Sequence, residues 1–133
     1  MALKSVIPEL PVADVDRSAA FYRDVLGFQF ATRLQDEEGA DWACLKSGSV
    51  RLYLHRSAAA ADPATAPLRA AIRLWFRPQN LEEVRDSLLA RGHRPSELVR
   101  TSYGTRECSL TDPDGYSICL QEFMADLSEA PPD

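Results

Sequence analysis

Apolar and polar positions alternate with two different periods along the first half of the chain, and the changes of period mark its predicted elements. Residues 5–11 alternate like a strand, and apolar side chains then recur at helical spacing between a capping residue, Asp14, and a terminating glycine, Gly27. Further strand-like runs follow at residues 28–34, 42–46 and 50–55. The first half therefore predicts a β-α-β-β-β module.

The second half repeats this order after a stretch without apolar periodicity. Residues 57–68 are rich in alanine and proline and predict a surface linker. A strand at 70–76 follows, and Asn80 with Glu83 resembles a capping box at the start of a helix that ends near Gly92. The remaining elements are strands at 97–100, 106–110 and 117–122, with residues 112–115 as a turn.

The two halves correspond residue by residue at a constant shift. Adding 66 to the numbers of one apolar set gives the other, and the pairs are Val6 with Ile72, Pro8 with Leu74, Leu10 with Phe76, Leu52 with Ile118, and Leu54 with Leu120. Because side chains alternate along a strand, the intervening residues share the opposite face. They are Ile7, Glu9, Tyr53 and His55 in one half and Arg73, Trp75, Cys119 and Gln121 in the other.

These patterns predict an α+β fold of two tandem βαβββ modules, whose eight strands form two half-open mixed sheets around a cavity on that second face. We expect one domain over residues 1–133, with modules at 5–56 and 69–123, a linker at 57–68 and a tail at 124–133.

Composition narrows the classes of partner. With 133 residues, 45% hydrophobic, the chain has the size of a single domain, and it shows neither a membrane-spanning run nor a signal peptide, so we expect a cytoplasmic protein. A net charge of −5 argues against nucleic-acid binding. Three cysteines without CxxC spacing are interpreted as reduced, buried thiols.

Two stretches carry a family resemblance: residues 11–28, PVADVDRSAAFYRDVLGF, and 103–122, YGTRECSLTDPDGYSICLQE. They resemble the two halves of the vicinal oxygen chelate superfamily, which contains glyoxalases, bleomycin-resistance proteins and extradiol dioxygenases. The resemblance covers about residues 5–123. It is specific for the fold and weak for function, because this fold hosts lyases, isomerases, dioxygenases and binding proteins.

In the metalloenzymes of this superfamily, four inward residues bind one divalent ion. The corresponding positions here are Ile7, Tyr53, Arg73 and Cys119. Isoleucine has no lone pair to donate, and arginine places a permanent cation where the ion would lie. A register shift by one residue gives only proline and leucines. We therefore expect no metal and no other cofactor. Two interpretations of His55 stay open: it contributes to a mixed metal site with Glu122, or it is an imidazole that forms a hydrogen bond at the end of a strand.

The resemblance is nearest to the metal-free bleomycin-resistance branch, which implies aromatic side chains that clamp a planar ligand. The matching positions are Trp42 and Tyr103, and alternation adds Trp75. Strand packing for Trp42 and a covering role for Tyr103 are equally compatible interpretations. Arg73 would anchor an anionic or neutral ligand, whereas Glu9 and Glu107 are the acidic residues expected nearby.

Function follows as two hypotheses. The first is a metal-free binding protein that sequesters a planar antibiotic or aromatic metabolite and so confers antibiotic resistance. It would be a homodimer whose N-terminal arm, hinged at Pro8 and Pro11, is exchanged between subunits. The expected ligand-binding residues are Trp42, Tyr53, His55, Arg73, Trp75, Tyr103, Glu107 and Cys119.

The second hypothesis is a lyase, isomerase or dioxygenase-like enzyme, either metal-free or with an unusual metal site. A metal-free reaction would use Tyr53, His55 or Cys119, with Arg73 lowering the pKa of the Cys119 thiol. Arg106 and Glu107 are expected to form a structural ion pair at the sheet edge.

Overall fold

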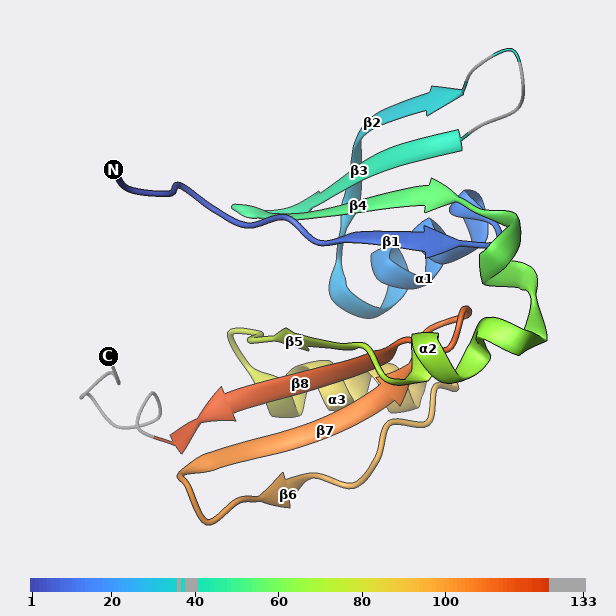
Figure 1. Ribbon diagram of the computed structural model, residues 1–133. Helices are drawn as coiled ribbons and strands as arrows, with labels where there is room; N and C mark the ends of the chain where they lie inside the picture. Colours follow the sequence, from blue (N-terminus) through green and yellow to red (C-terminus); the bar gives the residue numbers. More distant parts are fainter. Residues whose placement is uncertain (36, 38–40, 125–133) are drawn as a thin grey trace. The chain divides into compact units, whose positions relative to one another are not determined.

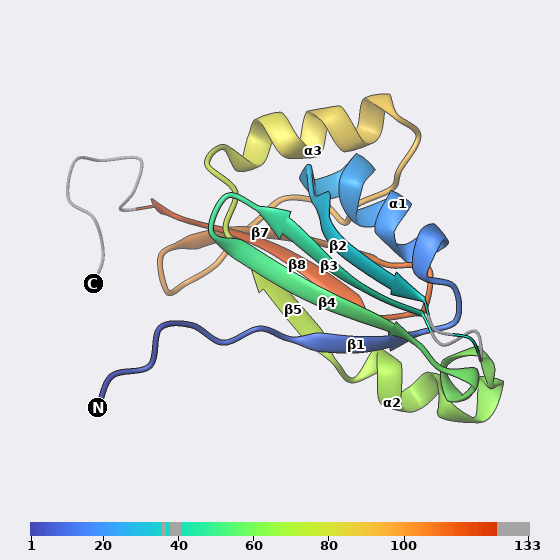
Figure 2. The ribbon, with the colours of Figure 1, turned by 90° about the horizontal axis from the view of Figure 1, so that it is seen from above.

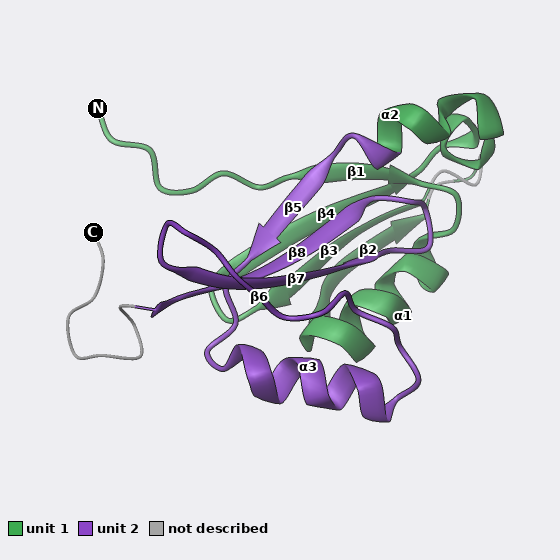
Figure 3. Ribbon diagram, turned by 90° about the horizontal axis from the view of Figure 1, so that it is seen from below, with its two compact units in different colours: residues 1–69 green, residues 70–133 purple. Residues whose placement is uncertain are grey.

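The computed structural model describes residues 1–35, 37 and 41–124, and the chain separates into two compact units, residues 1–69 and 70–133 (Figure 3). Each unit contains one four-stranded mixed sheet, so the expected α+β class is confirmed and the eight strands divide into two sheets. The predicted tail lies outside the described residues except for Met124.

Unit 1 follows the predicted β-α-β-β-β order (Figure 1). Its strand order is β1-β4-β3-β2, in which β1 is parallel to β4 and the other neighbours are antiparallel. The elements are β1 Glu9–Val12, α1 Val15–Leu26, β2 Gln29–Gln35, β3 Asp41–Ser47 and β4 Val50–Arg56.

Unit 2 repeats the arrangement with the order β5-β8-β7-β6, again with one parallel pair, β5 and β8. Its elements are β5 Arg73–Phe76, α3 Leu81–Ala90, β6 Val99–Arg100, β7 Thr105–Thr111 and β8 Ser117–Phe123. Figure 2 gives a second view of both helices and of the strand order.

The predicted linker is not irregular. It forms two 3-10 turns, Ala58–Ala61 and Pro63–Thr65, and the short helix α2, Ala66–Ala70. Alanine is the strongest helix former, and proline is well placed in a first turn. Asp62 adds a cap by accepting a hydrogen bond from the Ala64 amide at 2.9 Å. Helix propensity therefore decides the structure where apolar periodicity is missing.

Helix α1 begins and ends where the sequence predicts. The Asp14 side chain accepts a hydrogen bond from the Arg17 amide at 3.1 Å, and Gly27 adopts a left-handed conformation with φ 72°. Tyr22 on its apolar stripe is fully buried. Helix α3 is capped in the same way, because Asn80 accepts a hydrogen bond from the Glu83 amide at 3.1 Å.

The strand register confirms the internal duplication. Glu9 lies opposite Tyr53 in unit 1, and Trp75 lies opposite Cys119 in unit 2. Adding 66 to the numbers of the first pair gives those of the second. The correspondence slips by one residue between β3 and β7. Trp42 lies opposite His55 and Glu107 opposite Gln121, so that 121−55 is 66 but 107−42 is 65. Trp42 and Glu107 therefore occupy equivalent places.

Three positions differ from the predicted apolar pattern. The first strand begins at Glu9 rather than at residue 5, and Val6 is 90% exposed. Proline has no amide to donate, and here Pro8 takes part through its carbonyl, which accepts a hydrogen bond from the Tyr53 amide. Ile72 precedes β5 and is 41% exposed. Helical spacing predicts Leu89 on the apolar face of α3, but this residue is 46% exposed.

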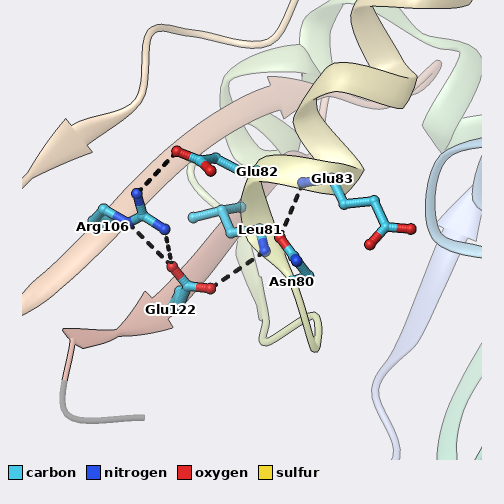
Figure 4. Close-up of polar contacts among 6 residues, drawn as sticks. All are labelled: Asn80, Leu81, Glu82, Glu83, Arg106 and Glu122. Carbon is cyan, nitrogen blue, oxygen red and sulfur yellow. Dashed lines mark hydrogen bonds and ion pairs between the residues drawn. The ribbon is translucent and has the colours of Figure 1, made fainter. Parts of the chain in front are cut away.

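An ion network ties the helix to the sheet in each unit, with its arginine on β2 in unit 1 and on β7 in unit 2. In unit 1, Arg33 contacts Asp41 of β3 at 3.0 Å and Asp16 in the first turn of α1 at 2.6 Å. In unit 2, Arg106 contacts Glu122 of β8 at 2.5 Å and Glu82 in the first turn of α3 at 3.2 Å (Figure 4). These contacts identify the helix-covered face of each sheet. The opposite face of each sheet is called its second face below.

Over the part of the chain that the structure describes, no helix is both long enough and apolar enough to cross a membrane.

Candidate functional site

The second face of unit 1 carries a cluster of four side chains. The rings of Trp42 and Tyr53 lie with their centroids 4.9 Å apart and their planes tilted by 57°. The Trp42 indole donates a hydrogen bond from Nε1 to Glu9 Oε1 at 3.5 Å. The other Glu9 oxygen, Oε2, lies 2.9 Å from Nδ1 of His55. We call Glu9, Trp42, Tyr53 and His55 the aromatic cluster.

Local strand geometry explains this clustering. Glu9 lies opposite Tyr53 in the parallel β1–β4 pair, and Trp42 lies opposite His55 in the antiparallel β3–β4 pair. Opposite residues project to the same side of a sheet, as do residues two apart on one strand. Three neighbouring strands therefore bring the four side chains together, although they lie up to 46 residues apart in sequence, 55−9.

The contact between His55 and Glu9 is close but poorly aligned. Nδ1 of His55 is buried and lacks a partner in hydrogen-bonding geometry, although the Glu9 carboxylate lies at ion-pair distance. The side chains of both residues are partly exposed, at 38% and 47%. A ligand can therefore reach this pair.

The second face of unit 2 is organised around one carboxylate. Glu107 Oε2 accepts hydrogen bonds from the Tyr103 hydroxyl at 3.0 Å, from the Thr105 hydroxyl at 2.9 Å and from the Gln121 amide at 2.9 Å. Tyr103 itself is 67% exposed, whereas Thr105 is fully buried. The carboxylate therefore connects a buried strand residue to an exposed loop aromatic. We call Tyr103, Thr105, Glu107 and Gln121 the carboxylate cluster.

Glu107 is held in its ionised form. Burial raises the pKa of its carboxyl, but the hydrogen bonds from Gln121, Thr105 and Tyr103 together lower that pKa more, and the net value lies below the usual 4.5. A carboxylate that accepts several hydrogen bonds is stabilised as the anion. The second face of unit 2 consequently carries a fixed negative charge at neutral pH.

Three predicted site residues share this face with the carboxylate cluster. Trp75 lies opposite Cys119, and Arg73 lies opposite Ser117 in the same parallel pair. Trp75 is 47% exposed, but Cys119 is only 7% exposed. The ring of Trp75 is thus available to a ligand, and the thiol is largely withdrawn.

The expected activation of Cys119 is wrong. Burial raises the pKa of this thiol, Arg73 lowers it, and Glu107 raises it again, so that the net pKa lies above its usual value. Desolvation outweighs the nearby guanidinium. The expectation of buried thiols holds for all three cysteines, which are free and buried.

Arg106 and Glu107 do not pair with each other. Adjacent residues of a strand point to opposite faces, so Arg106 lies on the helix-covered face and binds Glu122, while Glu107 lies on the second face. Glu122 is 6% exposed, and its other oxygen accepts a hydrogen bond from the Leu81 amide at the start of α3 (Figure 4). A mixed site that combines Glu122 with His55 is therefore not supported, because both Glu122 oxygens serve the sheet and helix.

The donor set does not fit the divalent metal that the fold family uses. The corresponding residues are Ile7 and Tyr53 in unit 1 and Arg73 and Cys119 in unit 2, and the raised pKa keeps the Cys119 sulfur protonated. A metal ligand must be deprotonated and must offer a lone pair. Across residues 1–35, 37 and 41–124, no group of three or more His, Cys, Asp or Glu side chains is placed to hold an ion.

Strand alternation placed five of the eight expected residues on the second faces: Tyr53, His55, Arg73, Trp75 and Cys119. The family resemblance supplied Trp42 and Tyr103, and Glu107 was expected to pair with Arg106. The polar side chains that organise the two faces were underweighted. Glu9 lies at the centre of the aromatic cluster, and Thr105 and Gln121 hold Glu107. Strand alternation puts these three residues on the same faces as the aromatic side chains. Their hydrogen-bond partners, however, depend on register between strands that are distant in sequence.

Comparison with known proteins defines the class to which this fold belongs. A family described as bleomycin resistance protein-like N-terminal matches residues 4–44. Among curated proteins, no sequence matches this chain. Solved structures match over nearly the whole chain.

A bleomycin-binding protein solved in complex with bleomycin is 26% identical, covers 90% of this chain and 98% of its own, and superposes with a TM-score of 0.66. TnmS3, an antibiotic binding protein from Streptomyces sp. CB03234, is 23% identical over 92% and 98% of the two chains, with a TM-score of 0.71. A glyoxalase-related enzyme from Clostridium phytofermentans is 17% identical over 92% and 97%, also with a TM-score of 0.71.

The chain therefore has the glyoxalase/bleomycin-resistance fold, and its structural neighbours are proteins of that type. The N-terminal match and the fold together confirm the resemblance to the vicinal oxygen chelate superfamily that the two sequence motifs carry.

Proposed function

We propose that this protein is a metal-free binding protein that sequesters a planar antibiotic or aromatic metabolite. The observation that carries the proposal is the aromatic cluster, in which Trp42 and Tyr53 form a tilted pair whose indole is held by Glu9. Aromatic rings fixed on a rigid sheet offer a stacking surface at low cost in conformational entropy. The exposed rings of Trp75 and Tyr103 extend the same chemistry to the second unit.

Two structural neighbours support binding rather than turnover, since one is an antibiotic binding protein and another was solved with bleomycin bound. In this chain, the metal-ligand positions carry side chains that do not suit a divalent ion. Stacking and hydrogen bonding need no ion.

The binding form is proposed to be a homodimer. Residues 1–6 are exposed, and Leu3 and Val6 are 91% and 90% exposed. Apolar side chains at this level of exposure are stabilised when a second copy covers them. We propose that the two copies exchange this arm and that Pro8 and Pro11 form its hinge.

Titration calorimetry on wild type and Trp42→Ala tests the binding function. Bleomycin and a panel of planar antibiotics and aromatic metabolites are first ranked by thermal shift. We expect Trp42→Ala to weaken every ligand bound by the wild type by about tenfold or more, because buried tryptophans are frequent energetic hot spots. Leu89→Ala, at an exposed apolar position on α3, is the matched control and should leave affinity unchanged. Unchanged affinity in Trp42→Ala contradicts the proposal.

A second candidate function, a metal-free lyase or isomerase, is favoured by one contact. Glu9 Oε2 lies 2.9 Å from His55 Nδ1, and a carboxylate in this position orients an imidazole for proton transfer at its other nitrogen. In this hypothesis, His55→Ala and Glu9→Gln abolish turnover of a ligand that still binds. A ligand recovered unchanged after long incubation with wild-type protein dismisses it.

A further inference from the structure

Glu107 uses its two carboxylate oxygens unequally. Three donors of the chain, from Tyr103, Thr105 and Gln121, all converge on Oε2. Within residues 1–35, 37 and 41–124, no group donates a hydrogen bond to Oε1, and this atom is not buried. The second oxygen is therefore reachable from outside the cluster.

A purely structural role would use the carboxylate in another way. Glu122, on the other face of the same sheet, is saturated on both oxygens, by Arg106 and by the Leu81 amide (Figure 4). It neutralises a cation and caps a helix. Glu107 is partnered with neutral donors only, and so its negative charge is not compensated within the cluster.

The neighbourhood of Glu107 carries the features of a recognition site. The Tyr103 ring is 67% exposed, yet its hydroxyl is fixed at 3.0 Å from the carboxylate. A tyrosine in a loop whose hydroxyl is held by a hydrogen bond keeps one orientation, and its ring is then accessible to a ligand. A planar group stacked on that ring would lie beside an ionised acceptor with one oxygen available.

We propose that Glu107 determines ligand specificity on the second face of unit 2: it positions the Tyr103 ring and accepts, at Oε1, a hydrogen bond from a protonated or N–H-bearing group on a planar ligand. This inference rests on the proposed binding function. The sequence-based expectation was an anionic or neutral ligand anchored by Arg73, whereas this inference requires a ligand that carries a hydrogen-bond donor. The two oxygens of Glu107 then have different roles: Oε2 holds the cluster and Oε1 binds the ligand. Charge-assisted hydrogen bonds of this kind are stronger than neutral ones.

The test compares three planar probes by fluorescence titration at neutral pH. Proflavine is cationic and carries amino donors, acridine is a largely neutral ring of the same shape, and anilinonaphthalene sulfonate is anionic. Wild type should prefer proflavine to acridine. Glu107→Gln keeps the shape of the side chain and removes its charge, and we expect it to lower proflavine affinity about tenfold while leaving acridine affinity within a factor of about two.

Two further variants separate specificity from folding. Glu97→Gln makes the same charge change at an exposed residue of unit 2 and should leave the proflavine-to-acridine ratio unchanged. Tyr103→Phe keeps the ring but removes the hydroxyl that Glu107 holds, so it should weaken both probes. Raising the salt concentration should reduce the preference of wild type for proflavine over acridine. The affinity ratio of the two probes for Glu107→Gln should not change with salt.

The outcomes distinguish this inference from the binding function itself. If the ligands found by thermal shift bind wild type and are weakened by Trp42→Ala, but Glu107→Gln leaves the proflavine-to-acridine affinity ratio unchanged, the role of Glu107 is refuted and the binding function stands. If wild type binds none of the three probes, the role of Glu107 is refuted, and the calorimetric titration of bleomycin and the ligand panel decides the binding function separately. A selective loss of proflavine in Glu107→Gln alone supports the inference.

Discussion

Neighbouring side chains on a single strand serve different purposes in this protein. On β7, Arg106 points to the helix-covered face and pairs with the buried Glu122, whereas Glu107 points to the second face and holds Tyr103. The side chain of Arg106 is 18% exposed and that of Glu122 is 6% exposed. The first contact stabilises the fold, and the second prepares the site.

Arg106→Ala should destabilise the protein strongly. Removal of one partner from a buried ion pair leaves an uncompensated charge, which costs about 3 kcal/mol. Chemical denaturation followed by circular dichroism measures the change in the free energy of unfolding. Arg23→Ala removes an exposed pair, whose side chains are 65% and 50% exposed, and should change the free energy of unfolding far less, because solvent screens the pair. Equal losses in the two variants would show that the Arg106 network is not a stabilising contact.

Glu107 should make the free energy of unfolding depend on pH in the acidic range. Its folded pKa lies below the usual 4.5, so its contribution is fully present above that value and is lost as the pH falls through the folded pKa. As the pH falls below 4.5, the free energy of unfolding of wild type should therefore decrease more steeply than that of Glu107→Gln. Parallel curves for the two proteins would contradict the lowered pKa.

The sequence predicts residue positions better than residue partners. Strand alternation correctly places Tyr53 and His55 on the second face of unit 1, and Trp75 and Cys119 on that of unit 2. It does not reveal that Glu107 binds Gln121, because that pairing depends on a one-residue offset between β3 and β7 relative to the internal duplication. The partners of Arg106 are missed for a different reason, since proximity in sequence suggested Glu107.

At the scale of elements, local capping signals fix the helices. Asp14 and Gly27 bound α1 as the sequence predicts, and Asn80 begins α3. The segment after β4 was predicted as a surface linker because it lacks apolar periodicity, and alanine propensity with the Asp62 cap gives it two 3-10 turns and a short helix. Periodicity reports burial, and a short exposed helix does not need burial to form.

Gly27→Ala should cost about 1 kcal/mol of stability, because only glycine adopts a left-handed conformation without strain. The φ of Gly27 is 72°, and an added Cβ would meet no atom within 4 Å, so the cost comes from the backbone alone. Gly27→Asn should lose less, since asparagine tolerates this conformation better. Thermal unfolding of both variants checks the order, and equal or reversed losses would contradict it.

At the scale of the whole molecule, one βαβββ design is used twice. The two units share their strand order and the register of their parallel strand pair, and each has an ion network between helix and sheet. The duplication was visible in the sequence as the shift of 66, and it predicted the class of fold. Its chemistry is not duplicated, because Trp42 in unit 1 is replaced by Glu107 at the equivalent place in unit 2.

The proposed dimer is tested by mass. Light scattering after gel filtration should give about twice 14.8 kDa for the full chain. Deletion of residues 2–7, which precede β1, should shift the population toward monomer if the arm is exchanged. A monomeric full chain would contradict the dimer, and an unchanged dimer in the deleted chain would contradict arm exchange alone.

The most direct test of the binding site uses the two tryptophans, the only ones in the chain. Trp42 and Trp75 each give one indole N–H signal in a nitrogen–proton correlation spectrum, and the Trp42→Phe and Trp75→Phe variants assign the two signals. Addition of a ligand chosen by thermal shift should move the Trp42 signal, because its Nε1 donates to Glu9 inside the aromatic cluster. A ligand that binds tightly while the Trp42 signal stays in place would show that binding occurs elsewhere.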